Sequence, residues 1–229
     1  MTIVVIHQPQ YLPWLPLIAK ADASDVFVYL DNVQYQKNGI QNRNQIKSAT
    51  GPLWLTVPVR ASLDLEIRSV PIDGHHWQTK HQKSLLQNYA KAPFVHLLTE
   101  DIFPILAREW ENIADLNIAL MEWMFVYLNV QTRRIKASDL QAAGNKQELV
   151  INLCKELGAS QYLSGMGAST YQNEEDFKAQ GIELRHFHFA PKEYPQQYPK
   201  LGFVSGLSII DLLLNVGPDA RNWMKGGRL

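Results

Sequence analysis

Residues able to do chemistry gather near the start of this chain. His7 directly follows the apolar run Ile3 to Ile6 and opens a loop that holds Gln8, Tyr11 and Trp14. An imidazole can accept a proton or donate a hydrogen bond to a phosphate near neutral pH. Its position at the end of a predicted strand favours a catalytic role for His7. The two aromatic side chains are either substrate contacts or plugs that cover the end of the sheet.

A second polar segment follows the next apolar run, residues 26–30. Its candidate site residues are Asp31, Gln34, Asn42, Arg43, Asn44 and Lys47. The planar guanidinium of Arg43 matches phosphate or carboxylate, and an amide side chain can donate and accept at once. We expect Asp31 to act in catalysis beside His7 and the others to bind substrate. For Arg43 and Lys47 the alternative is a solvated, turn-rich β segment.

A glycine-containing loop, Ser164-Gly165-Met166-Gly167, lies between a predicted strand and a predicted helix. Glycine lets backbone N–H groups approach an anion, and the start of a helix favours negative charge. The loop matches neither a P-loop nor the full dinucleotide fingerprint. We expect Ser164, Gly165 and Gly167 to contribute to substrate binding.

Two further positions are candidates. In the segment His75-His76-Trp77, with Lys80 and His81 after it, no Asp, Glu or Cys stands at metal-ligand spacing, so we expect no metal site. Lys80 and His81 are expected to point from a helix into a polar cleft. Asp211 lies in an apolar helix and is either a buried cap or a site residue.

These residues must be positioned by an α/β scaffold. Apolar runs predict strands at 2–6, 26–30, 45–47, 54–59, 134–137, 161–163 and 183–189. Helical spacing is found at 77–89, 94–109 with a break at Pro104, 113–130, 145–157, 171–180 and 207–215. The sequence therefore predicts one domain over 1–229 with a mainly parallel, Rossmann-like sheet. Residues 1–72 and 131–217 form its core, and 74–130 form a helical insertion.

The same layout predicts where the site lies. Parallel strands bring their carboxyl ends to one edge of a sheet, and ligands bind there. We therefore expect His7, Asp31 and Ser164 to converge at one edge, with the helical segment from 76 to 130 covering or flanking the cleft.

Composition limits the class of protein. The chain has 229 residues, 22 Lys+Arg against 22 Asp+Glu, and a single cysteine, Cys154. Balanced charge gives no electrostatic case for duplex nucleic acid. No apolar run is long enough to span a bilayer, and the start of the chain lacks the basic segment of a signal peptide. With no disulfide possible within the chain, we expect a cytoplasmic protein that acts on a small-molecule substrate.

Several motifs in order resemble the WbqC-like family. They are His7-Gln8-Pro9-Gln10-Tyr11-Leu12-Pro13-Trp14, 31–35, Asn42-Arg43-Asn44, 54–59, Tyr162-Leu163-Ser164-Gly165 and 207–213. The resemblance covers about residues 3–217, although Leu15-Pro16 replaces the Gly-aromatic pair often found in relatives. It implies a cytoplasmic enzyme of bacterial surface-polysaccharide (O-antigen) biosynthesis, with amino-acid (glycine) transfer as the suggested reaction.

Three hypotheses follow. The first is group transfer on an activated, nucleotide-linked or phosphate-bearing substrate, with His7 as the base and Arg43, Lys47 and the 164–167 backbone holding the anion. The second is nucleotidyl transfer with a nucleoside triphosphate and Mg²⁺, suggested by the similar layout of nucleotidylyltransferases. The second histidine of their motif is absent here. The third is a non-catalytic ligand-binding or assembly protein.

Overall fold

The computed structural model describes residues 1–61, 64–168, 172–225 and 227–228, and it confirms the predicted α/β fold. The main sheet contains, in spatial order, β5 (Arg133–Lys136), β2 (Val26–Tyr29), β1 (Ile3–His7), β6 (Gln161–Gly165), β7 (Glu183–Phe189) and β8 (Gly227–Arg228). The first five of these strands are parallel, and β8 pairs antiparallel with β7.

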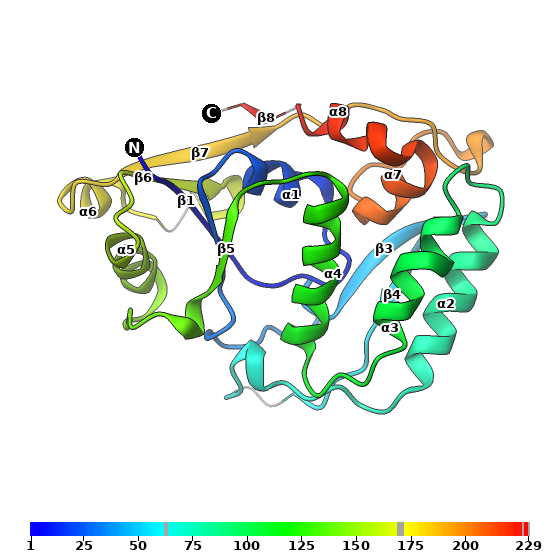
Figure 1. The fold of residues 1–229 in the computed structure, drawn as a ribbon, viewed down its shortest axis with the longest axis horizontal. Coiled ribbons are helices and arrows are strands. Elements are labelled where there is room, and N and C mark those ends of the chain that lie inside the picture. Colours follow the sequence, from blue (N-terminus) through cyan, green and yellow to red (C-terminus); the bar gives the residue numbers. More distant parts are fainter. Residues whose placement is uncertain (62–63, 169–171, 226, 229) are drawn as a thin grey trace.

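Helices cover both faces of this sheet (Figure 1). The helices of the described residues are α1 (Leu15–Asp22), α2 (His76–Tyr89), α3 (Phe103–Leu106), α4 (Ile113–Tyr127), α5 (Lys146–Glu156), α6 (Glu174–Lys178), α7 (Ile209–Val216) and α8 (Arg221–Met224), and α2 and α3 lie away from the main sheet. Helices α5 and α6 pack against one face, and α1, α4 and α7 contribute to the core on the other. Strand β1 suits the centre because side chains on both of its faces are apolar, and Val4 and Val5 are fully buried.

The order of the strands creates a point of divergence beside β1. From β1 the chain moves outward to β2 and later to β5, and it then returns to the other side of β1 to form β6 and β7. The loops that leave β1 and β6 therefore diverge, which opens a crevice between them at the carboxyl edge. His7, Asp31 and Ser164 all lie at this edge, as expected from parallel strands.

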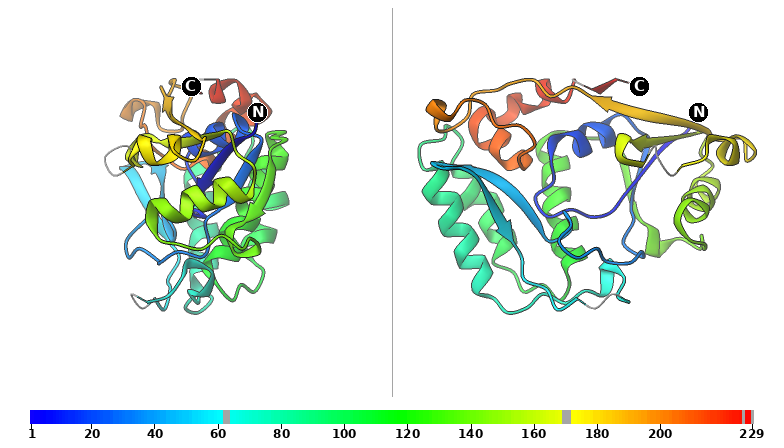
Figure 2. Two further views of the ribbon diagram at one scale, coloured as in Figure 1. Left: turned by 90° about the vertical axis from the view of Figure 1, so that its left-hand side faces the viewer. Right: turned by 180° about the vertical axis from the view of Figure 1, so that it is seen from behind.

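The strands β3 (Arg43–Ser48) and β4 (Gly51–Thr56) form a separate antiparallel hairpin. Figure 2, seen from behind, shows this hairpin beside α2 and far from α5 and α6. The predicted strands at 45–47 and 54–59 thus correspond to a hairpin outside the main sheet. Its turn is made by Gly51, whose φ of +110° is accessible to glycine at little cost.

The helical segment between β4 and β5 lies behind the loop that follows β1. Asn117 of α4 donates to the backbone oxygens of Pro9, at 3.2 Å, and Gln41, at 2.7 Å. The predicted break near Pro104 is present as a π-helical turn at Leu98–Ile102, followed by α3. Proline has no N–H to donate to the preceding turn, which accounts for the interruption.

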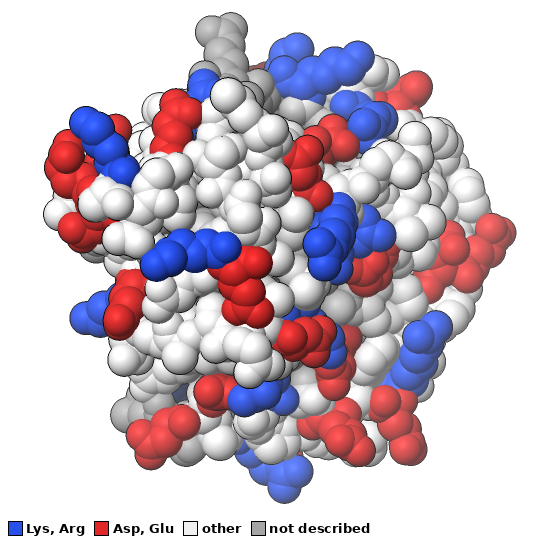
Figure 3. Space-filling model, turned by 60° about the vertical axis from the view of Figure 1, so that its left-hand side comes forward, with Lys and Arg blue, Asp and Glu red and all other residues white. Residues whose placement is uncertain are grey.

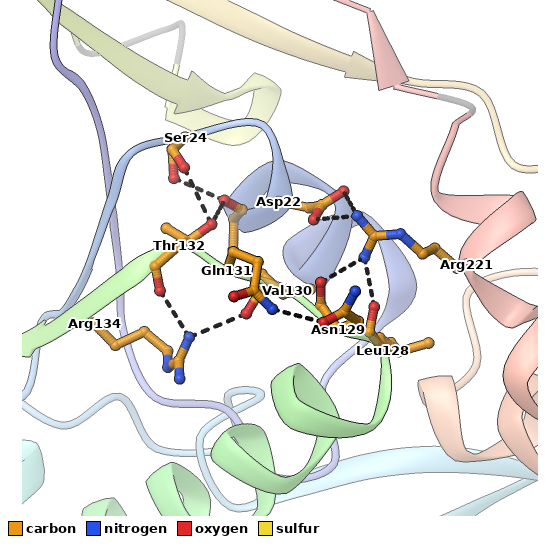
Figure 4. Close-up of polar contacts among 10 residues, drawn as sticks. Asp22, Ser24, Leu128, Asn129, Val130, Gln131, Thr132, Arg134 and Arg221 are labelled. Carbon is orange, nitrogen blue, oxygen red and sulfur yellow. Dashed lines mark hydrogen bonds and ion pairs between the residues drawn. The ribbon is translucent and has the colours of Figure 1, made fainter.

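Helix α1 is fixed at its carboxyl end by contacts distant in sequence (Figure 4). Arg221 of α8 donates to the backbone oxygens of Leu128 and Asn129 and pairs with Asp22 at 3.1 Å. Thr132 donates to the oxygen of Ala21 at 2.7 Å.

Among the described residues, no helix combines the length and the apolar composition needed to cross a bilayer.

Candidate functional site

A cleft of about 1800 Å³ lies at the carboxyl edge of the sheet. Its walls come from the loops after β1, β2, β6 and β7, the first turns of α1 and α5, and the segment between β7 and α7. Of the predicted site residues, those that line it are His7, Gln8, Trp14, Gln34, Ser164, Gly165 and Gly167. None of the residues 76–130 is among those that line it, so the helical segment does not contribute side chains to the cleft.

His7 lines the cleft, and its hydrogen bonds indicate which ring nitrogen carries the proton. Its Nδ1 lies 3.0 Å from the Gln8 carbonyl oxygen, which can only accept, so Nδ1 carries the proton. The lone pair is therefore on Nε2, and the Gln10 amide nitrogen lies 3.4 Å from it. Burial, together with the charge of Lys20, lowers the pKa of His7 to about 3. The imidazole is neutral in the empty cleft.

Lys20 is a buried cleft residue that the sequence patterns did not predict. It belongs to a helix of sequence LPLIAKAD, and it is only 5% exposed. Helical side chains lean toward the amino end of their helix, so Lys20 extends back to the carboxyl edge of the sheet and lines the cleft. A Cβ built on Gly165 would stand 3.4 Å from its Nζ.

The ammonium group of Lys20 has no carboxylate partner among the residues that the structure describes. Within the described ranges, no hydrogen bond or ion pair engages its Nζ. Burial lowers the pKa of Lys20 from its ordinary 10.5 to about 8. A buried, unpaired cation is energetically costly, so an anion that entered the cleft would relieve this cost.

The loop after β6 forms the opposite wall. Ser164 is fully buried and donates to the side-chain oxygen of Gln172 at 2.7 Å. Gly165 is approached only by Lys20, and a Cβ on Gly167 would meet nothing within 4 Å. The backbone at the two glycines is thus open to a ligand.

Amide side chains line the part of the cleft nearest β2. Gln41 donates to the Gln8 side-chain oxygen at 2.8 Å, which fixes the orientation of Gln8. Gln34 forms an isolated bridge with Glu66, and both residues line the cleft. Trp14, at the amino end of α1, is 43% exposed on the rim.

Asp31 is placed at the correct edge but faces away from the cleft. It is 2% exposed, and both carboxylate oxygens accept from Ser138, one from the backbone N–H at 3.0 Å and one from the hydroxyl at 2.6 Å. The carboxylate therefore secures the turn after β5. These hydrogen bonds give Asp31 a structural role, and it is not among the residues that line the cleft.

The polar residues of the hairpin also lie outside the cleft. Arg43 stacks over the Trp54 ring at 4.6 Å and donates to the Asn38 carbonyl oxygen. Asn42 and Asn44 donate to the backbone oxygens of Val57 and Leu12, at 2.8 and 2.6 Å. These hydrogen bonds hold the hairpin and its neighbouring loops together.

Tyr11, Lys80 and His81 are likewise remote from the cleft. Tyr11 is fully buried, and its hydroxyl donates to His81 Nδ1 at 2.7 Å, while His81 Nε2 lies 3.2 Å from the Thr56 carbonyl oxygen. Burial lowers the pKa of His81 to about 4, so this pair is a neutral anchor between α2 and the loop after β1. Lys80 is exposed to solvent.

Lys47 and Asp211 belong to a buried polar network behind the cleft. The Lys47 Nζ donates to Gln196 at 3.1 Å and to the Gly202 carbonyl oxygen at 2.6 Å. The Asp211 carboxylate accepts from Tyr89 at 2.7 Å and from Gln196 at 2.8 Å. The network pins residues 190–207, which we call the strap. The strap forms one wall of the cleft.

Sequence reasoning missed Lys20 because α1 was treated only as a connection between strands. The signal was present, since a single lysine lies on the buried stripe of an otherwise apolar helix. It also missed four aromatic side chains that line the cleft, Phe187, Phe189, Tyr194 and Phe203. Phe187 and Phe189 are two residues apart on β7, so their side chains point to the same face of the sheet.

Charge elsewhere is mixed. On the face drawn in Figure 3, Lys and Arg alternate with Asp and Glu, and no large area of one sign is present. Among the described residues, no group of three or more His, Cys, Asp or Glu is placed to hold a metal ion.

Comparison with known proteins agrees with the resemblance in sequence. The model of the WbqC-like protein family matches residues 8–223. The chain is 33% identical over 226 residues to "Uncharacterized protein Rv1507c" of Mycobacterium tuberculosis (strain ATCC 25618 / H37Rv), and the match covers 97% of each chain. No solved structure matches it. The chain with this cleft beside β1 and β6 belongs to the WbqC-like protein family.

Proposed function

We propose that the protein is a group-transfer enzyme that acts on an activated, phosphate-bearing substrate bound between His7 and Gly165. The observation that carries this proposal is the buried ammonium of Lys20, which lines the cleft and forms no ion pair with any residue that the structure describes. A buried cation with no structural partner is more easily explained by a ligand than by stability. The chemical group that matches it is an anion, and because a Cβ on Gly165 would stand 3.4 Å from the Lys20 Nζ, an anion at the ammonium would lie beside the Gly165 backbone.

The roles of the two titratable groups differ. An incoming amine or hydroxyl loses its proton to His7 Nε2, and its electron pair attacks the activated centre. The bond to the phosphate-bearing leaving group breaks, and that group departs with the bonding pair. Lys20 stabilises its negative charge. A bound anion also raises the pKa of His7 from about 3, because it offsets the repulsion from Lys20 and favours the imidazolium.

The size of the cleft suits a reaction with two substrates. Pockets for one small ligand usually measure about 300–1,000 Å³. The cleft, at about 1800 Å³, can hold a donor and an acceptor at the same time. Polar groups including Gln8, Gln34 and Glu66 line its β2 side and are placed to orient the acceptor.

The family supplies the biological context of the proposal. Resemblance to WbqC-like proteins implies surface-polysaccharide biosynthesis in the bacterial cytoplasm, with glycine as one candidate for the transferred or accepting amino acid. A neutral imidazole beside a cationic amine can serve amide formation from an activated acyl donor or C–N bond formation with a glycosyl donor, because the imidazole takes the proton and the amine stabilises the leaving group.

Product analysis tests the proposal. The parent protein is incubated with nucleotide sugars or other phosphate-activated donors together with amino acids, and products are identified by mass spectrometry. The proposal expects a new amide or amine whose formation depends on Lys20 and His7, with Lys80→Met, at an exposed lysine, as the matched control. Release of pyrophosphate without a transferred group, or binding without any turnover, would contradict it.

A further inference from the structure

The cleft has an aromatic wall, formed by Phe187, Phe189, Tyr194 and Phe203. Phe187 and Phe189 are nearly parallel, with ring centroids 6.2 Å apart and planes at 29°. Tyr194 and Phe203 meet edge to face at 5.2 Å, and both belong to the strap. These rings bring a flat apolar surface to a cleft whose opposite, β2 side is lined by amides and carboxylates.

The wall begins next to the anion-binding groups. Gly165 of β6 is the register partner of Phe187 on β7, so the two backbones are one strand spacing apart, about 4.8 Å. Phe189 lies two residues further along β7, which adds about 6.6 Å. The path from the Lys20 ammonium across Gly165 to Phe189 is therefore comparable to the span from the phosphates of a nucleotide to its base.

The order of groups along the edge of the sheet also fits a donor with a phosphate at one end and a flat ring at the other. The amide-lined side follows β2, His7 ends β1, Lys20 reaches Gly165 at the end of β6, and the aromatic wall follows on β7. A donor whose phosphate lies at Lys20 thus has its flat portion on the β7 side. Its activated centre faces His7, and the acceptor occupies the β2 side.

We infer that the aromatic wall stacks the base of a nucleoside diphosphate whose phosphates bind at Lys20 and Gly165. This inference rests on the proposed function, because it identifies the donor of that reaction as nucleotide-linked. Stacking of a base on aromatic side chains is worth about 1–3 kcal/mol and tolerates different bases, because every base has a π face. A sugar phosphate or an inorganic anion would gain only the contacts at Lys20 and Gly165.

Calorimetric titration with UDP, ADP, glucose 1-phosphate and inorganic pyrophosphate tests the inference. We expect the two nucleotides to bind the parent protein at least 10-fold more tightly than pyrophosphate or glucose 1-phosphate do. Phe189→Leu should weaken UDP and ADP by about 10-fold or more and leave pyrophosphate unchanged. The unchanged pyrophosphate affinity shows that the variant is folded.

Two additional variants complete the design. Phe203→Leu removes a ring contributed by the strap and should have the same selective effect as Phe189→Leu. Trp54 lies outside the cleft and is 48% exposed. Trp54→Leu should therefore change neither the affinity for nucleotides nor the affinity for pyrophosphate.

The outcomes separate this inference from the proposed function. If pyrophosphate binds and depends on Lys20 but UDP and ADP bind no more tightly, the anion site stands and the base-stacking wall is wrong. If the nucleotides bind tightly and neither phenylalanine variant weakens them, the wall is again wrong. If none of the four probes binds, the proposed function fails together with the inference.

Discussion

Lys20, in the last turn of α1, reaches the end of β6, where a methyl group on Gly165 would stand 3.4 Å from its Nζ. No carboxylate accompanies the ammonium within the described part of the chain. Two segments 145 residues apart in sequence thus create a buried positive charge beside an open backbone. This relationship predicts that Lys20 lowers the stability of the empty protein and raises its affinity for anions.

Replacement of Lys20 by methionine should therefore stabilise the protein at neutral pH. The pKa of Lys20 is about 8 in the folded state and 10.5 in its ordinary environment, so at pH 7 the folded state bears the cost of the buried charge. A difference of that size corresponds to about 3 kcal/mol. The measurement is urea unfolding of the parent, Lys20→Met and the exposed control Lys80→Met.

The advantage of Lys20→Met should depend on pH in a defined direction. Between pH 8 and 10.5 the unfolded parent binds more protons than the folded parent, so the parent gains stability as the pH rises. The difference between parent and variant should be largest below pH 8 and vanish above 10.5. A variant that is less stable than the parent at pH 7 would show that the amine has a stabilising partner.

Anion affinity should respond to the same titration. A bound anion favours the charged amine, so the pKa of Lys20 in the complex lies above its value of about 8 in the empty cleft. Affinity for inorganic pyrophosphate should fall as pH rises through 8, and binding at pH 8 should take up protons. Calorimetry in buffers of different ionisation enthalpy measures that uptake, and Lys20→Met separates it from titration of the pyrophosphate itself.

His7→Gln should reduce the rate of transfer and leave the fold intact. A positioned proton acceptor contributes roughly 10²–10⁴-fold, while glutamine is another polar side chain of similar reach. Because the pKa of His7 is about 3 in the empty cleft, kcat/KM should show no acidic limb from this group between about pH 5 and 7. The acidic limb should instead be found in kcat, since the bound anion raises the pKa of His7. Turnover by His7→Gln at the parent rate would assign His7 to binding or packing.

Asp211→Asn should loosen the strap. The carboxylate accepts from Tyr89 and Gln196, and Gln196 in turn accepts from Lys47. Asparagine keeps only one of the two acceptor oxygens and loses the negative charge that acts on Lys47, so we expect the free energy of unfolding to fall by about 1–3 kcal/mol. Urea unfolding measures the loss, and hydrogen exchange should show weaker protection of residues 190–207. The double variant Asp211→Leu with Lys47→Met should be more stable than Asp211→Asn, because no unpaired charge is then buried. Equal stability of Asp211→Asn and the parent would contradict this account of the network.

The elements of the fold were largely predictable because they depend on local patterns. The β-branched run before His7 and the apolar run 26–30 indicated adjacent parallel strands, and the structure pairs them residue by residue. Residues 45–47 and 54–59 also have strand character, but the local sequence does not specify which sheet a strand joins. Pairing within the hairpin is decided by the turn at Gly51.

The site was less predictable, because the direction of a side chain depends on tertiary contacts. Arg43 and Lys47 carry the charge expected of anion-binding residues. However, Arg43 stacks on Trp54, and Lys47 donates to Gln196 in the buried network. The first residue of the predicted helix at 171–180 lies outside the described residues, and α6 begins at Glu174. Lys20 was overlooked because a lysine in a short helix is usually exposed.

The most direct test of the central claim is calorimetric titration of inorganic pyrophosphate into the parent, Lys20→Met and Arg43→Lys proteins at pH 7. A charged hydrogen bond to a ligand in a buried site is worth about 1.5–3 kcal/mol, so Lys20→Met should weaken binding by roughly 10- to 100-fold. Arg43→Lys, at a guanidinium outside the cleft, should leave the affinity unchanged. Equal affinity of the parent and Lys20→Met, or a loss confined to Arg43→Lys, would show that the anion does not bind beside Lys20.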